Sequence, residues 1–345
     1  MAIRRAIRVF IVDDSILFRE TMAREMSRDP GIEVVGEAGS AKEAKALLET
    51  LTPDVMTLDV EMPGQSGVDF VRELMSENPM PVVMVSSLSD AVFDAMSSGA
   101  VDFVVKPGTL GRSGMDSFIN ELLIKVKIAS TAKVGRLRQA APAAAQPAAA
   151  AKENTLIVLG ASTGGTEATA SVMRCLPHDL PGIVIVQHMP PVFTRMYAER
   201  LNNISKVEVR EAVDGDRIRP GLALVAPGSF QLQVKRDSEG FFVHTYEAEK
   251  VNGHAPSVDV LFLSAAKAAG ANAVGLILTG MGNDGAKGLL EMRQQGAFTI
   301  GQDEKSCVVY GMPKVAYDIG AVERQCPLES IPGELLAYLG KKGLL

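Results

Sequence analysis

Carboxylates in the first part of the chain fall where they could hold a metal ion and accept a phosphoryl group. Asp13 and Asp14 directly follow one short apolar run, and Asp59 follows another. Clustered carboxylates repel one another and favour a hard divalent cation with oxygen ligands, most naturally Mg²⁺. A carboxylate beside such a cation can attack a phosphoryl group and form an acyl phosphate. These positions therefore predict a Mg²⁺ site made by Asp13, Asp14 and Asp59.

A hydroxyl and an ammonium group extend this first predicted site. Ser86 and Lys106 each close a further apolar run, and both side chains are suited to hold phosphate oxygens. Any one aspartate in such a position is more often a helix cap or a turn residue. Five matching groups spread over four strand ends favour the functional interpretation over that simpler one.

A serine in the second half of the chain could act as a nucleophile. Residues 160–164 read Gly-Ala-Ser-Thr-Gly, the G-x-S-x-G spacing of a sharp strand-to-helix turn that exposes a serine hydroxyl. Such a serine, Ser162, needs a base. His188 follows the next apolar run and is the favoured base, with His254 as the alternative. Asp284, in a glycine-rich segment after a further run, is placed to orient an imidazole.

Other interpretations of the second site are simpler. The serine could cap a helix, His188 could be a loop residue, and Asp284 could belong to an ordinary turn. A nucleotide-binding loop fits poorly, because the glycines do not match G-x-G-x-x-G and the next run ends in Gln187-His188 instead of an acidic residue. Three groups at three strand ends favour a hydrolytic triad. Its order, Ser…His…Asp, differs from that of α/β-hydrolases, so that fold is not predicted.

Alternating strand and helix patterns must position both sets of residues. In the first part the predicted strands are Val9–Val12, Ile32–Ala38, Asp54–Leu58, Pro81–Val85 and Val101–Val105. Helices are predicted between them, including one from Ser15 to Arg28 and one from Ser40 to Leu51. Such alternation predicts an α/β unit with a five-stranded parallel sheet covered on both faces. The carboxyl ends of parallel strands meet at one edge, which gathers the first site.

The second part repeats this alternation after a low-complexity seam. Its clearest predicted strands are Thr155–Leu159, Ile183–Val186, Leu222–Val225 and Val274–Leu278, and residues 230–249 read as an antiparallel hairpin turning at 237–240. We expect a doubly wound α/β domain with that hairpin. The seam is rich in Ala and Pro, with little to bury, and reads as a flexible linker. The expected organisation is therefore 1–129, a linker at 130–153, and 154–345.

Composition limits the partners and the compartment. The chain has 345 residues, a net charge of −6 and a pI near 5.4, which argues against nucleic acid or an anionic membrane as a partner. No helix-turn-helix pattern is present. Cys175, Cys307 and Cys326 form no CxxC pair and read as reduced thiols. The first apolar run stops at Asp13-Asp14 and is neither a signal peptide nor a membrane span. We expect a cytoplasmic protein without direct membrane insertion.

The first half resembles the receiver domain of bacterial response regulators over about residues 6–128. The matching motifs are Asp13-Asp14, Leu-Asp-Val-Glu-Met-Pro at 58–63, Val-Ser-Ser at 85–87 and Val-Lys-Pro at 105–107. The resemblance implies a flavodoxin-like fold, with Asp59 as phospho-acceptor, Phe103 as the switch aromatic and a chemotaxis-type histidine kinase as donor. The segment Leu88–Gly99 is about one helical turn shorter than is usual in that family.

The second half resembles the catalytic domain of the CheB family of chemotaxis protein-glutamate methylesterases over about residues 154–338. The matching motifs are Gly-Ala-Ser-Thr-Gly-Gly-Thr at 160–166, Gln-His-Met-Pro-Pro at 187–191, Pro-Ser-Val-Asp-Val-Leu-Phe at 256–262, Gly-Met-Gly-Asn-Asp-Gly at 280–285 and Ser-Cys-Val-Val-Tyr-Gly-Met-Pro at 306–313. One departure is that Gly253 and Ala255 flank His254 where the family more often has basic residues.

The second resemblance implies a reaction. Ser162 would attack the methyl ester of a chemoreceptor glutamate, with His188 as base and Asp284 orienting its imidazole. The backbone N–H of Met281 would lie in the oxyanion hole, and Thr163 would support His188. Methanol leaves and water frees the glutamate, without a cofactor. The same chemistry covers glutamine deamidation. His254 becomes a candidate for the substrate pocket.

The combined resemblance further implies that the unphosphorylated receiver covers the serine site. Two alternatives to a phosphorylation-controlled methylesterase remain. One is a response regulator whose output half binds a partner or a nucleotide without catalysis. The other is a DNA-binding regulator, which the acidic charge and the missing helix-turn-helix disfavour. Methanol release from methylated receptor fragments distinguishes the first two.

Overall fold

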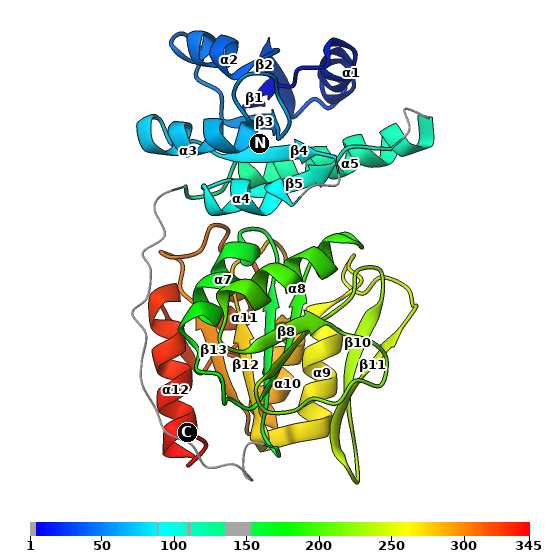
Figure 1. Ribbon diagram of the computed structural model, residues 1–345, viewed down its shortest axis with the longest axis vertical. Coiled ribbons are helices and arrows are strands. Elements are labelled where there is room, and N and C mark those ends of the chain that lie inside the picture. Colours follow the sequence, from blue (N-terminus) through cyan, green and yellow to red (C-terminus); the bar gives the residue numbers. More distant parts are fainter. Residues whose placement is uncertain (1–4, 88–89, 109–111, 135–152) are drawn as a thin grey trace. The chain divides into compact units, whose positions relative to one another are not determined.

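The chain folds into two compact units, Met1–Arg136 and Leu137–Leu345, in the computed structural model shown in Figure 1. The structure describes residues 5–87, 90–108, 112–134 and 153–345. Most of the predicted linker, residues 135–152, therefore lies outside the described residues. Each unit is considered by itself below.

The first unit has a five-stranded parallel sheet in the order β2-β1-β3-β4-β5, which is the flavodoxin-like order. Its strands are β1 (Ile7–Val12), β2 (Ile32–Ala38), β3 (Val55–Asp59), β4 (Val82–Ser86) and β5 (Asp102–Val105). Strands β3 and β4 are buried along their whole length, as expected when helices cover both faces. The predicted fold of this unit is confirmed, with strand ends shifted by one or two residues.

Helices cover this sheet on both faces. They are α1 (Ile16–Met26), α2 (Ala41–Leu48), α3 (Gly67–Glu77), α4 (Ala91–Ser97) and α5 (Arg112–Ala129), with α1 packed against α5 and α3 against α4. The side chains of Ser15, Ser40 and Ser66 cap the first three helices. Gly67 lets α3 begin directly against β3, because a Cβ there would lie 2.0 Å from the Asp59 carbonyl oxygen.

The second unit has a seven-stranded parallel sheet in the order β14-β13-β12-β6-β7-β9-β8. The strands are β6 (Leu156–Ala161), β7 (Gly182–Gln187), β8 (Glu208–Glu211), β9 (Leu222–Val225), β12 (Ala273–Ile277), β13 (Phe298–Gln302) and β14 (Arg324–Cys326). The four predicted strands are β6, β7, β9 and β12. Sequence analysis did not anticipate β8, β13 and β14.

Two layers of helices and a hairpin complete the second unit. The helices are α7 (Gly165–Cys175), α8 (Phe193–Ile204), α9 (Val258–Ala269), α10 (Ala286–Gln294), α11 (Met312–Asp318) and α12 (Ile331–Lys341), with short 3₁₀ turns at Gly270–Asn272 and Leu328–Ser330. Helices α7, α8 and α12 pack on one face and α9, α10 and α11 on the other (Figure 1). The predicted hairpin is confirmed as β10 (Gln231–Asp237) and β11 (Gly240–Tyr246), packed against α9.

Each sheet has a topological switch point, where the connections from two adjacent strands leave toward opposite faces of the sheet. In doubly wound folds, ligands bind outside the carboxyl ends of the strands at such a point. In the first unit this point lies between β1 and β3, and in the second it lies between β6 and β12. Asp13 and Asp59 stand at the first point, and Ser162 stands at the second. In the described part of the chain, no helix is long and apolar enough to cross a membrane.

Candidate active sites

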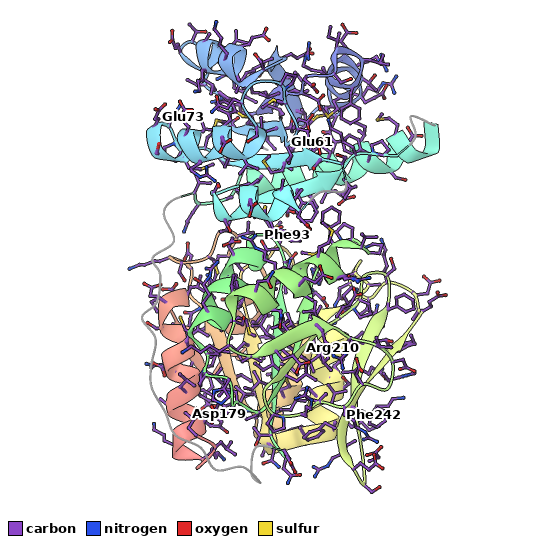
Figure 2. The ribbon with its side chains drawn as sticks, viewed as in Figure 1. Glu61, Glu73, Phe93, Asp179, Arg210 and Phe242 are labelled. Carbon is purple, nitrogen blue, oxygen red and sulfur yellow. The ribbon has the colours of Figure 1, made fainter. Side chains whose placement is uncertain are left out.

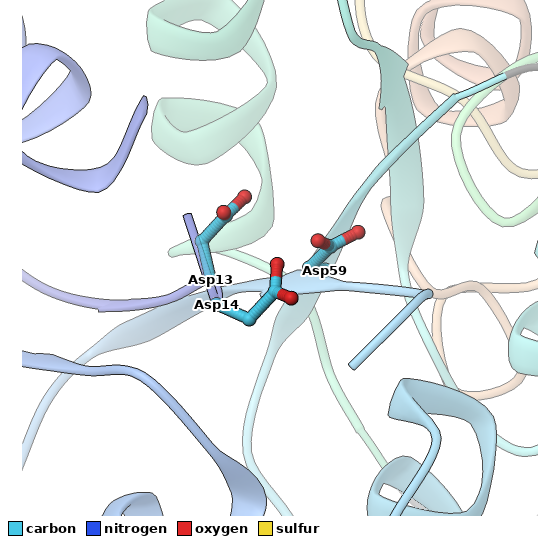
Figure 3. Close-up of side chains that lie close together, drawn as sticks. All are labelled: Asp13, Asp14 and Asp59. Atoms are coloured by element: carbon cyan, nitrogen blue, oxygen red, sulfur yellow. The ribbon is translucent and has the colours of Figure 1, made fainter. Parts of the chain in front are cut away.

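The first site gathers three carboxylates at the carboxyl edge of the receiver-like sheet. Ligand oxygens of Asp13, Asp14 and Asp59 all lie within 4.8 Å of one another (Figure 3). Asp13 and Asp59 are buried, whereas Asp14 is exposed. Lys106 Nζ lies 2.6 Å from Asp59 Oδ2 and 2.8 Å from Asp13 Oδ2. The structure thus brings together four of the five groups that the sequence placed at this edge.

Burial and charge set the protonation behaviour of this cluster. Burial raises the pKa of Asp59, and the negative charge of Asp13 adds to it, although the ammonium of Lys106 opposes both. Burial alone would lower the pKa of Lys106, but its bonds to the two carboxylates outweigh that effect and raise the pKa. Burial therefore leaves the carboxyl of Asp59 more basic than an ordinary aspartate, and its part in accepting a phosphoryl group stays a prediction.

Ser86 and Phe103 lie on the neighbouring strands. Ser86 is buried at the end of β4, where its hydroxyl donates to the carbonyl of Ser87 at 2.7 Å. Phe103 on β5 is buried and meets Phe93 of α4 edge to face, with ring centroids 6.3 Å apart (Phe93 is labelled in Figure 2). The ammonium of Lys125 lies 5.1 Å from the Phe103 centroid. Their roles in holding and signalling phosphate stay predictions.

The second site begins at the turn between β6 and α7. Ser162 directly follows β6, and its backbone N–H donates to the carbonyl of Thr279 at 3.0 Å. The turn uses a left-handed residue at Gly164, with φ of 74°. A Cβ at Gly165 would lie 2.6 Å from the Cβ of Ala161 and 2.3 Å from Gln187 Oε1, so a larger residue there would force the turn or these neighbours to shift. The sequence-predicted turn is present, and Ser162 is half-buried within it.

A hydrogen bond connects the predicted base and acid. His188 Nε2 lies 2.8 Å from Asp284 Oδ2, and both side chains are buried. His188 directly follows β7, and its backbone N–H donates to the Ala161 carbonyl beside Ser162. His188 Nδ1 has no partner among the described residues, so it is the ring nitrogen left to accept a proton from a serine. Within the described chain no hydrogen bond joins Ser162 to His188, which is common for catalytic groups before substrate binds.

A cradle of donors holds the carboxylate of Asp284. Besides His188, the donors are Asn252 Nδ2 at 2.7 Å, Ser257 Oγ at 2.8 Å, the backbone N–H of Val258 at 2.6 Å and that of Asp259 at 3.2 Å. The last three belong to the N-terminus of α9, whose partial positive charge favours an anion. Burial would raise the pKa of Asp284, but the bonds from His188, Asn252 and Ser257 hold it well below its usual range.

His254 stands beside the triad as a stacked ring. Its centroid lies 3.6 Å from that of His188, with 7° between the planes. Burial, together with the neighbouring His188, lowers the pKa of His254 to about 4, so this ring is neutral at pH 7. Because Asp284 bonds to His188, the favoured base of the sequence analysis is the one that the structure joins to the acid.

Two further predicted residues lie near the serine. Met281 follows Gly280, which packs against Ser162, and its side chain is 46% exposed. The backbone N–H of Met281 donates to no group in the described part of the chain. Thr163 is buried, and its carbonyl accepts from Thr279 Oγ1 at 3.0 Å. Its support of His188 stays a prediction.

Comparison with known families identifies both units. Residues 157–335 match the family model described as CheB methylesterase, and residues 9–112 match the response regulator receiver domain. A protein of Syntrophomonas wolfei named protein-glutamate methylesterase/protein-glutamine glutaminase 2 is 55% identical over 327 residues, covering 95% of this chain and 96% of its own. The chain belongs to the CheB methylesterase family.

Other members of the CheB family agree with this assignment. A protein-glutamate methylesterase/protein-glutamine glutaminase of Syntrophotalea carbinolica is 46% identical over 349 residues, which cover 98% of this chain and 99% of that protein. The crystal structure of the Thermotoga maritima CheB methylesterase catalytic domain is 37% identical, with a TM-score of 0.52. It covers 53% of this chain and 98% of the Thermotoga chain. The predicted fold of the second unit is thereby confirmed.

The hydrogen bonds of Asn252 and Ser257 to Asp284 in this CheB-family site were not predicted from the sequence. Both residues lie far from Asp284 along the chain, by 32 and 27 positions. The available signals were the dipeptide Asn252-Gly253, which is typical of a tight turn, and Ser257 directly before an apolar helical run. Each signal indicates local structure only, so neither pointed to Asp284.

We expect His254 to make the second unit sensitive to pH. Its pKa in the folded protein is about 4, below the ordinary 6.5, so the unfolded chain binds the proton more readily. Its contribution to stability is therefore complete above about pH 6.5 and is lost as the pH falls toward 4, by at most about 3 kcal/mol. In chemical denaturation, the free energy of unfolding of His254→Phe should fall less between pH 6.5 and 4 than that of the wild type.

The matched control is His178→Phe, which replaces an exposed histidine of the same unit. Between pH 6.5 and 4, its free energy of unfolding should fall as much as that of the wild type. Equal slopes for wild type and His254→Phe would contradict the interpretation that a half-buried, neutral His254 is stacked on His188.

Proposed function

We propose that this chain hydrolyses glutamate methyl esters on methyl-accepting chemoreceptors, under the control of phosphorylation. The observation that carries the catalytic part is the buried pair of His188 and Asp284 beside Ser162, with His188 Nδ1 left as an acceptor. The relatives' names, which combine methylesterase and glutaminase, support the same substrate class. We assign residues 1–129 to the receiver, 130–153 to the linker and 154–345 to the catalytic domain.

The first half-reaction forms an acyl-enzyme. Ser162 Oγ attacks the ester carbonyl carbon while His188 takes the serine proton, and the resulting imidazolium is stabilised by the charge of Asp284. The negative charge on the carbonyl oxygen is stabilised by a backbone N–H, for which that of Met281 is available. His188 then returns the proton to the departing methoxy group. Methanol leaves, and the glutamate side chain is esterified to Ser162.

The second half-reaction frees the receptor. His188 removes a proton from water, which attacks the acyl carbon, and the same proton passes back to Ser162 as the bond to the serine breaks. The products are a free glutamate and an unchanged enzyme. An amide substrate follows the same path with ammonia as the leaving group, so we include glutamine deamidation in the proposal. His254 and Thr163 would line and support this site.

The receiver would control this reaction through an acyl phosphate on Asp59. Asp13, Asp14 and Asp59 offer three carboxylates within 4.8 Å, a donor set that suits Mg²⁺. When bound, that ion would neutralise charge on the phosphoryl group. Ser86 and Lys106 would hold phosphate oxygens. Phe103, as the switch aromatic, would respond when these two residues move toward the phosphate. A chemotaxis-type histidine kinase is the proposed donor, and the reactions would take place in the cytoplasm.

The triad assignment predicts a graded loss of activity. Ser162→Ala should abolish methanol release from methylated receptor fragments, since no other group is placed to carry the acyl chain. His188→Ala should cost about as much, on the order of 10⁴-fold or more in kcat, and Asp284→Asn somewhat less, because a triad acts as a unit. His254→Ala is the control for the base. A fatal His254→Ala with a mild His188→Ala would reverse the assignment.

The phosphorylation assignment predicts a loss of stimulation with basal activity retained. Asp59→Asn keeps the shape of the side chain and removes the nucleophile. A small phosphodonor with Mg²⁺ should therefore stimulate methanol release by the wild type and not by this variant. Stimulation that survives Asp59→Asn, with the acyl phosphate mapped to another aspartate, would contradict the assignment.

The direction of control is tested by separating the units. All three triad residues belong to the second unit, so a chain of residues 150–345 contains the whole proposed catalytic site. If the unphosphorylated receiver hinders access to Ser162, this fragment should release methanol faster than the unphosphorylated full chain. The rate of the phosphorylated full chain is the control. Equal rates for the fragment and the unphosphorylated chain would show that the receiver does not inhibit.

A further inference from the structure

A tight turn just before α9 reaches both the base and the acid of the triad. Val251 and His254 exchange two backbone hydrogen bonds, of 3.0 and 2.9 Å, around Asn252 and Gly253. Both central residues have positive φ, 53° and 85°, as a type I′ turn requires and as Asn-Gly favours. From this turn, the side chain of Asn252 bonds to Asp284, and the ring of His254 stacks on His188.

The amide of Asn252 bridges two carboxylates. Its Nδ2 donates to Asp284 Oδ1 at 2.7 Å and to Asp259 Oδ2 at 2.8 Å, which uses both of its hydrogens. Asp259 is 4% exposed, and its other oxygen accepts from the backbone N–H of Gly288 at 2.7 Å. Asp259 has no described contact with His188. The bridge therefore connects the triad acid to a second carboxylate that lies between α9 and α10.

These two carboxylates would repel each other without the bridge. Burial raises the pKa of Asp259, and the negative charge of Asp284 adds to it, which shows that the groups are close enough to interact. A buried carboxylate oxygen without a donor is costly, and in the described part of the chain Asn252 is the one donor to Asp259 Oδ2, so this oxygen favours the arrangement that keeps the amide between the two carboxylates. Asp284 Oδ1 accepts from Ser257 Oγ and the Asp259 N–H as well as from Asn252. Asn252 thus bonds one oxygen of Asp284 while His188 bonds the other.

We propose that Asn252 is a positioning residue of the triad, which acts on the reaction by holding Asp284 in line with His188. This inference rests on the proposed hydrolysis. Asn252 is an exposed residue, so it contributes little to the core. Its exposure also leaves a competing explanation, in which Asn252 contacts the substrate. Kinetics separate the two, because a positioning residue affects kcat and a binding contact affects KM.

The test measures methanol release by the full-length chain with methylated receptor fragments. Asn252→Gly removes the amide and keeps the positive-φ turn, and Asn252→Asp keeps the size but cannot donate. We expect kcat to fall about tenfold for Asn252→Gly, with KM within about twofold of the wild type, and to fall at least as far for Asn252→Asp. The matched control is Asn202→Ala, which removes a bond to the Val209 N–H elsewhere in the unit and should leave kcat unchanged.

A double-mutant cycle then asks whether Asn252 acts through Asp284. In an Asp284→Asn background, adding Asn252→Gly should change kcat less than about twofold, because the carboxylate that it positions is already gone. An equal loss of kcat in both backgrounds would overturn the inference. A raised KM with unchanged kcat would overturn it in favour of substrate contact, and wild-type kinetics for both variants would show that Asn252 has no role.

Methanol release by the wild type shows whether a negative result concerns Asn252 alone or the proposed hydrolysis as well. Methanol release that depends on Ser162 and not on Asn252 would retain the hydrolase and reject the positioning role. A folded wild type that releases no methanol would contradict the hydrolase and the inference together.

Discussion

The second unit is organised around one buried carboxylate. Asp284 would be costly to ionise in the interior, and it stays charged because His188, Asn252, Ser257 and the first N–H groups of α9 all donate to it. Because three of these donors belong to the first residues of α9, the helix must begin beside Asp284. The neighbouring strands β12, β6 and β7 then present the acid, the serine and the base at adjacent ends. The start of α9 and the geometry of the proposed triad therefore depend on the same hydrogen bonds to Asp284.

The two units use buried aspartates in opposite ways at equivalent places. Both sites lie outside the strand ends where the sheet connections diverge. Burial raises the pKa of Asp59, which would suit the proposed phospho-acceptor. Hydrogen bonds hold the pKa of Asp284 low, which suits a carboxylate that must remain charged while His188 carries a proton. The number of hydrogen-bond donors around each carboxylate, more than its burial, accounts for the opposite directions of the two pKa shifts.

The sequence was sufficient to predict which side chains lie at the edge of a sheet wherever they stand at the end of an apolar strand. Asp13, Asp59, Ser162 and His188 all do, because parallel strands end at one edge. Strands β8 and β14 lacked a usable signal: β8 has the polar sequence Glu-Val-Arg-Glu, and β14 has three residues. The hydrogen bond from Asn252 to Asp284 could not be predicted from the sequence either, since it spans 32 residues and depends on tertiary packing.

The central claim is that Ser162 carries the acyl group of the substrate. The direct measurement is peptide mass spectrometry after rapid acid quenching of the chain with a short peptide that contains a glutamate methyl ester. We predict an added mass equal to the peptide minus methanol, located on Ser162 and absent from Ser162→Ala. Methanol release at an undiminished rate with the adduct on another residue, or with Ser162→Ala fully active, would contradict the account.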